Sequence, residues 1–132
     1  MTTIASFDVL GVPKPQGSMR AFNNRVVHAK PKALMDWRGD IAKAAADCVT
    51  EKAERGTPVW IHATFRLERP KAAPKRVIRP TTKPDLDKLV RSLLDALTGI
   101  CFADDSQVVS LNVGKRFAAA EEPCGVFVEV LR

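Results

Sequence analysis

Residues 83–99, KPDLDKLVRSLLDALTG, contain the clearest periodic pattern in the 132-residue chain. Leucine and valine recur at positions 86, 89, 90, 93, 94 and 97, which is the spacing of one apolar stripe along a helix. Pro84 precedes the stripe and Gly99 follows it, the usual order of these two residues at helix ends. The pattern predicts an amphipathic helix from Asp85 to about Thr98.

Other periodic segments surround this helix. Residues 4–10, 57–67, 107–117 and 125–131 alternate with a period of two, which predicts four strands. Apolar residues at helical spacing predict a second helix from Pro31 to about Lys52, and residues 11–25, rich in turn formers, are expected to form a loop. The order β-α-β-α-β-β indicates an α/β (α+β) fold, with a small mixed or antiparallel sheet of about four strands and two main helices. The length fits a single domain, residues 1–132.

The composition excludes several classes of protein. No apolar run is long enough for a membrane span, and the N-terminal residues lack the pattern of a signal peptide. Cys48, Cys101 and Cys124 are odd in number and lie far apart, which argues against a disulfide framework or a zinc site. We therefore expect a cytoplasmic protein, in the bacterial host cytosol if a phage encodes it.

Charge is distributed unevenly along the chain. Lys and Arg number 21 against 15 Asp and Glu, a net charge of +6. Residues 81–105 hold five acids and three bases, a local charge of −2, so the remainder carries +8. A basic chain favours a nucleic-acid partner, although many small domains are basic for solubility alone. An acidic cluster in such a chain is understandable if a divalent cation reverses its sign.

The acidic residues occur in two places, Asp85 and Asp87 at the start of the predicted helix and Asp104 and Asp105 after it. Any one of them could be only a helix cap, a dipole partner or a turn residue. Together they are the oxygen ligands that Mg²⁺ prefers, and such a cation can activate water against a phosphodiester. The helix spans roughly 20 Å, so the set converges only if the following loop and strand run back along it. We expect that convergence.

A basic segment precedes the helix. Residues 68–84 contain four prolines, which exclude a regular helix, and a loop of this length is usually functional or mobile. We expect this loop and the first loop to bind DNA backbone, with a solvated charged loop as the alternative. The candidate cations are Lys14, Arg20, Arg69, Lys71, Lys75, Arg76, Arg79 and Lys83.

Three motifs together resemble the RusA family of Holliday-junction resolvases. They are F-x-V-x-G-x-P-x-P-Q-G at residues 7–17, D-L-D-K-L-x-R-x-x-L-D-A-L at 85–97 and F-A-D-D-S-Q-V at 102–108. The resemblance implies that Asp85, Asp87 and Asp105 are the catalytic acids and the ligands of Mg²⁺, for which Mn²⁺ can substitute. It also implies a homodimer that nicks symmetrically opposed strands of a four-way DNA junction.

The chain departs from the family pattern at two positions. Lys88 stands where Asn is common, and Arg91 stands where the family has Lys. Arg keeps the charge but is a planar donor, so Arg91 either assists catalysis or only pairs with Asp87 or Asp95. Lys115 is a candidate catalytic contact to phosphate, or else a plain strand lysine.

The leading hypothesis is therefore a Mg²⁺-dependent, structure-selective endodeoxyribonuclease that resolves Holliday junctions during DNA recombination and repair. Two alternatives stay open. One is a basic DNA-binding module without catalysis, which would bind in a salt-dependent way but would not cut. The other is a nuclease for flaps or RNA that uses the same metal chemistry. Asp104, next to the proposed ligand Asp105, either supports the metal ligands from behind or shapes a turn.

Overall fold

The computed structural model describes residues 1–17, 19–22, 25–28 and 31–132, and side chains outside residues 18–31. The main helices are α1 (Pro31–Cys48) and α2 (Leu86–Leu97), and a short 3₁₀ helix, η1 (Asp105–Gln107), precedes a strand. Within these described ranges, no helix combines the length and apolar character needed to cross a membrane.

One four-stranded sheet forms the base of the molecule. Its strands are β1 (Thr3–Leu10), β6 (Gly125–Leu131), β4 (Val59–Leu67) and β5 (Val108–Phe117), in that spatial order. β6 is antiparallel to both of its neighbours, whereas β4 and β5 are parallel and are connected through α2. The sheet is therefore mixed, and the predicted α+β fold with two helices is confirmed. β5 lies at an edge, which matters for the site.

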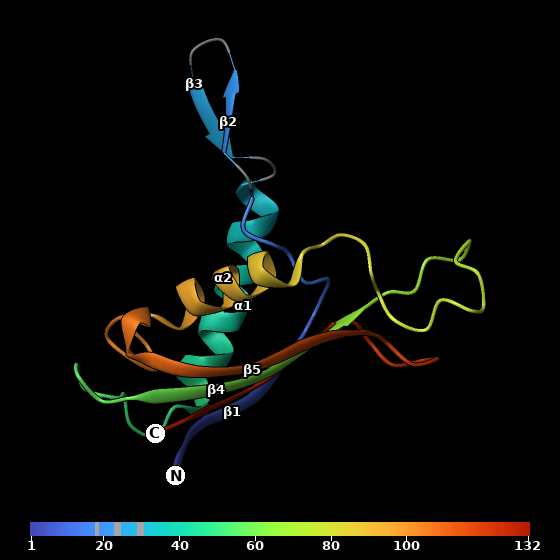
Figure 1. Ribbon diagram of the computed structural model, residues 1–132. Helices are drawn as coiled ribbons and strands as arrows, with labels where there is room; N and C mark the ends of the chain where they lie inside the picture. Colours follow the sequence, from blue (N-terminus) through green and yellow to red (C-terminus); the bar gives the residue numbers. More distant parts are fainter. Residues whose placement is uncertain (18, 23–24, 29–30) are drawn as a thin grey trace.

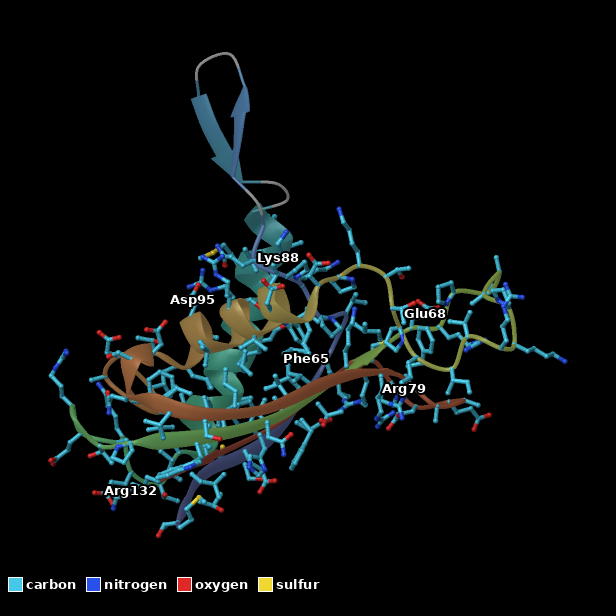
Figure 2. All side chains as sticks on the ribbon, in the orientation of Figure 1. Phe65, Glu68, Arg79, Lys88, Asp95 and Arg132 are labelled. Atoms are coloured by element: carbon cyan, nitrogen blue, oxygen red, sulfur yellow. The ribbon has the colours of Figure 1, made fainter. Side chains whose placement is uncertain are left out.

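The core lies between the sheet and the two helices, which cover the same face (Figure 1). Every second side chain of β4 is buried there, and Phe65 points from the sheet toward α2 (Figure 2). Leu89, Leu93 and Leu97 of the apolar stripe are fully buried against it. Each such side chain contributes about 1.5–3 kcal/mol through removal from water, so packing fixes the direction of α2 across the sheet.

The segment after β1 differs from the sequence expectation. Residues 11–25 were expected to form a loop, but β2 (Met19–Phe22) and β3 (Arg25–His28) pair antiparallel as a separate sheet. Figure 1 shows this pair beyond the N-terminal end of α1, away from the main sheet. Strands of four residues are too short to display a period of two, so the prolines, glycines and asparagines around them dominated the interpretation.

Cys48, Cys101 and Cys124 are all free thiols. Burial raises the pKa of the Cys101 thiol to about 12. Because the thiolate is the reactive form, Cys101 is an inert core residue.

Candidate active site

Asp85 occupies the N-cap position of α2 in an extended conformation, yet its carboxylate makes no capping hydrogen bond. The side chain is 48% exposed, and its nearest charged neighbour is Lys88, with Nζ 3.7 Å from the Asp85 carboxylate. Asp87 follows in the first turn and is exposed. The Asp85 carboxylate is therefore not used to cap the helix, and a capping role does not explain why an aspartate stands at this position.

A cavity of about 320 Å³ opens at this end of α2. The segment after β1, residues 11–17, forms one wall of the cavity. It is held against α2 by two hydrogen bonds: the backbone amide of Gln16 donates to the Lys88 carbonyl at 2.9 Å, and the Ser92 hydroxyl donates to the Lys14 carbonyl at 2.9 Å. The first and second of the three family motifs therefore meet here. The lining residues are Pro15, Gln16, Gly17, Lys83, Pro84, Asp85 and Lys88.

Lys115 reaches the same region from β5. Its ammonium group donates to the Thr82 carbonyl at 2.7 Å and to the Pro84 carbonyl at 2.8 Å. The Lys83–Pro84 peptide bond is cis. Lys115 thus lies beside the residue that precedes Asp85, and it acts there on the backbone of the segment that leads into α2.

Asp104 shapes the turn after α2. Its carboxylate accepts a hydrogen bond from the Ser106 amide at 3.0 Å, and its own amide donates to the Gln107 side chain at 2.9 Å. The Asp104 carboxylate also accepts from the Gln107 backbone amide, so Asp104 and Gln107 form a reciprocal capping box at the start of η1. The Gln107 side chain also donates to the carbonyls of Glu54 and Thr57, so the turn is fixed to the segment between α1 and β4.

Asp105 is exposed in η1 and belongs to an acidic environment. A hydrogen bond shared with Asp104 raises the pKa of the Asp105 carboxyl, and partial desolvation and the charges of Asp104 and Asp95 add to the effect. The pKa of Asp104 is lowered, chiefly by the Ser106 amide. Negative charge gathered around Asp105 favours binding of a cation.

Asp85 and Asp105 lie at opposite ends of α2. Asp95, whose charge acts on Asp105, is in the last turn of the helix, whereas Lys88, next to Asp85, is in the first (Figure 2). Twelve residues of α-helix span about 18 Å. The two carboxylates are therefore separated by about the length of the helix, roughly 20 Å.

The expected convergence of three carboxylates does not occur within one chain. The loop after α2 turns back at once, with Gly99 donating to the Phe102 carbonyl at 2.7 Å, so η1 stays at the C-terminal end of the helix. β5 does run back along α2, but it begins after Asp105 and brings Lys115 to the helix start instead. Across the described part of the chain, no three His, Cys, Asp or Glu side chains are grouped to hold a metal ion.

Arg69 organises the basic loop, residues 69–83. Its guanidinium donates to the carbonyls of Val77 and Pro74, and it lies over the Phe117 ring with 5.3 Å to the centroid. These contacts fasten the first half of the loop to the end of β5. The structure therefore directs Arg69 toward the loop itself, although it was expected to contact DNA.

Most of the other candidate DNA-binding residues are exposed to solvent. Five of them are exposed side chains of the basic loop, and this loop extends beyond the end of the sheet, where Figure 2 labels Arg79. Lys14 is half-buried in the first loop, and the side chain of Arg20, on β2, lies outside the described residues. The five exposed cations are Lys71, Lys75, Arg76, Arg79 and Lys83.

Arg91 is exposed on α2, one turn after Asp87. Among the ion pairs of the described residues, none joins Arg91 to Asp87 or Asp95. The pairing interpretation of Arg91 therefore gains no support, and its guanidinium is presented to solvent beside Asp87.

The sequence analysis missed Gln16 as a residue of this site. Gln16 lines the cavity beside Asp85, and its side-chain oxygen is buried without a hydrogen-bond donor among the described residues. The signal was present in the sequence, because Gln16 is the conspicuous polar residue of the P-K-P-Q-G motif. The described lining of the cavity supplies a single carboxylate, Asp85, beside Lys83 and Lys88. Within one chain this lining therefore does not provide the set of oxygen ligands that a hard divalent cation needs.

Comparisons with known proteins identify the family of the chain. The family model for Endodeoxyribonuclease RusA matches residues 10–131. An uncharacterized protein of Bacillus subtilis (strain 168), YqaN, is 34% identical, and the alignment covers 89% of each chain. The match of the family model includes the cavity, the basic loop and both pairs of aspartates. The chain therefore belongs to the RusA family of endodeoxyribonucleases.

Proposed function

We propose that this protein is a Mg²⁺-dependent endonuclease that resolves four-way DNA junctions by paired, symmetric nicks. The observation that carries the proposal is the juxtaposition of Asp85, in a cavity at the start of α2, with the exposed cations of the basic loop that leads directly into it. Membership of an endodeoxyribonuclease family supplies the class of reaction. Recombination and repair are the processes that such a cut would serve.

The metal ligands that we propose are Asp85 and Asp87 of one subunit and Asp105 of the partner subunit. The proposal follows from the positions of the acids at opposite ends of α2, since an antiparallel neighbour would present its own Asp105 end to the Asp85 end of the first chain. When bound, Mg²⁺ or Mn²⁺ polarises the scissile phosphate and activates water. The protein residues bind, orient and neutralise the DNA around it.

The exposed edge of the sheet supports such a dimer. β5 is an edge strand, and Val109 and Leu111 on it are 59% and 44% exposed. A bare edge with exposed apolar side chains pairs readily with another strand. Two copies related by a twofold axis would pair β5 antiparallel with its counterpart. If that axis passes near Ser110, Asp105 of one chain comes opposite Lys115 of the other, at the start of α2.

Twofold symmetry would also explain paired cutting. A closed dimer with this interface has two equivalent sites, each built from both subunits. A four-way junction offers two symmetry-related strands, so each site can take one of them. The exposed lysines and arginines of the basic loop, with Lys14 and Arg20, would contact phosphates on the arms, which gives binding that weakens steeply with salt.

The roles of two further cations follow from their positions. Arg91, exposed one turn after Asp87, is available to neutralise charge on the phosphate undergoing reaction. Lys115, held by the carbonyls of Thr82 and Pro84, would act as a positioning residue rather than as a direct phosphate contact.

The experiment compares wild type with Asp85→Asn on a mobile four-way junction, with Mg²⁺ and with a chelator. We expect wild type to nick symmetrically only with Mg²⁺, and Asp85→Asn to bind the junction normally but not to cut it. Cutting by Asp85→Asn at the wild-type rate would contradict the assignment. Flap, RNA and linear duplex substrates in the same gel test the selectivity, since preferential cutting of one of these would replace the junction as substrate.

A further inference from the structure

Arg55 is an exposed cation that the proposed function does not use. It lies between α1 and β4, in a turn that is closed by a hydrogen bond from the Thr57 amide to the Glu54 carbonyl at 2.9 Å. None of the ion pairs among the described residues includes Arg55. Its guanidinium is therefore available to a ligand.

The turn that carries Arg55 is fixed to the turn that carries Asp105. The Gln107 side chain donates to the Glu54 carbonyl at 2.8 Å and to the Thr57 carbonyl at 3.0 Å, one on each side of Arg55. Gln107 is buried and is the last residue of η1, which begins at Asp105. Within each subunit, the backbone at Arg55 is therefore held in a constant position relative to Asp105.

A cavity of about 210 Å³ lies between these two turns, and both Arg55 and Asp104 line it. Of the described residues around this cavity, Arg55 alone is positively charged. Asp95, Asp104 and Asp105 make this end of α2 acidic, which opposes the approach of a DNA phosphate. A DNA strand that comes close to Asp105 therefore needs a cation beside it, and Arg55 is placed to supply one.

We infer that Arg55 binds a phosphate of the DNA strand that is cut, at the active site to which its own chain contributes Asp105. The inference rests on the proposed function, and in a shared site Arg55 comes from the subunit that does not supply Asp85. A guanidinium suits this role because its planar fork donates two parallel hydrogen bonds to phosphate oxygens. Loss of Arg55 should weaken junction binding and also slow the cutting of bound junction, because the strand is then less well positioned.

The first test measures binding of a four-way junction to the full-length protein with Mg²⁺ present, in an Asp85→Asn parent that keeps the junction uncut. Adding Arg55→Gln removes the charge, and we expect about tenfold weaker binding. The slope of log affinity against log salt should fall by about one. Arg55→Lys should restore the slope but only part of the affinity, because an ammonium group does not donate as a fork.

Lys52→Gln is the matched control. Lys52 is exposed in the same connecting segment and the variant loses the same charge, but Lys52 does not line the cavity beside Asp104. Its affinity and salt slope should equal those of the parent. Arg55→Gln should also unfold in urea as the parent does, because the side chain is exposed. Parental affinity and slope in Arg55→Gln, or a loss of stability that accounts for the weaker binding, would overturn the inference.

Chains carrying Asp85→Asn and Asp105→Asn, refolded together, separate the two proposals. A shared site gives mixed dimers with one intact site, which takes Asp105 and Arg55 from the Asp85→Asn chain. At saturating junction, Arg55→Gln on that chain should slow the restored nicking about tenfold, and on the Asp105→Asn chain it should change nothing.

The same rate from either placement of Arg55→Gln would overturn the inference and leave the shared site intact. Absence of restored nicking before Arg55 is changed would contradict the shared site of the proposed function, and the binding measurements would then decide on Arg55.

Discussion

The ammonium group of Lys115 lies 2.8 Å from the carbonyl oxygen of Pro84, so the last part of β5 is fastened to the residue before Asp85. A second bond, 2.7 Å to the Thr82 carbonyl, makes the contact a clamp between strand and loop. Parallel pairing of β4 and β5 brings the two together, because it makes β5 return along α2. Lys115 therefore bonds to backbone in the structure, and its expected contact with phosphate stays a prediction.

Lys115→Met should lower both stability and cutting. Loss of two hydrogen bonds from a charged donor that is partly exposed is expected to cost about 1–2 kcal/mol of unfolding free energy, measured by urea titration. Lys75→Met, an exposed lysine of the basic loop, is the matched control and should unfold as wild type does. A Lys115→Met protein with unchanged stability but strongly reduced cutting would instead indicate direct contact with the substrate.

Arg69→Lys should loosen the basic loop without removing charge. Lysine cannot reproduce the forked donation to Val77 and Pro74, so residues 70–77 should become more sensitive to limited proteolysis. Junction binding should weaken by up to about tenfold, with an unchanged slope of log affinity against log salt.

Arg76→Ala provides the contrast, since Arg76 is exposed and forms no ion pair with the described residues. Its loss should reduce the salt slope by about one. The opposite assignment of slopes to the two variants would mean that Arg69 is the phosphate contact.

Gly125→Ala should be severely destabilising, because a Cβ atom there would collide with the Val9 carbonyl and lie 2.5 Å from the Arg66 guanidinium. Arg66 is buried and forms a forked pair with Asp8 at 2.7 and 3.0 Å, so there is little room for adjustment. We expect a loss of about 3 kcal/mol by chemical denaturation. Gly114→Ala, on the edge strand β5 with open space at the Cβ position, should stay within about 0.5 kcal/mol of wild type.

Acid should weaken the turn between β5 and β6 through Glu122. Hydrogen bonds from Arg116 lower the pKa of Glu122 from 4.5 to about 2. Because the folded pKa is below the unfolded one, the stabilisation is complete above pH 4.5 and is lost as pH falls toward about 2. Glu122→Gln should therefore be less stable than wild type at pH 6, and the difference should vanish near pH 2. A difference that does not change with pH would contradict this account.

The sequence predicted most of the fold because its strongest signals come from burial. The apolar stripe from Leu86 to Leu97 has the spacing of a helix and not of a strand. The observed boundaries of α2 agree with the prediction within one residue. The four strands of the main sheet were predicted for the same reason. Whether β5 is parallel or antiparallel to its neighbour could not be predicted, because alternation of side chains is the same in both arrangements.

The site was predicted less completely. The types of residue were informative, since paired aspartates in a basic chain indicate a cation, but their distances depend on where a loop turns. The capping box of Asp104 fixes η1 at the C-terminal end of α2. The spacing of apolar residues in the sequence does not predict where this turn lies. Gln16 was missed because it was considered only as part of the family motif at residues 7–17, whereas its place in the cavity depends on the fold.

The most direct test of the proposed shared site mixes two inactive variants, Asp85→Asn and Asp105→Asn, after denaturation and refolding together. If each site takes Asp85 from one subunit and Asp105 from the partner, every mixed dimer contains one intact site and one doubly altered site. Random assortment then restores up to about a quarter of wild-type nicking, as single cuts rather than paired ones. If both residues of a site come from one chain, every site in the mixture stays altered. In that case no activity returns, and the account is contradicted.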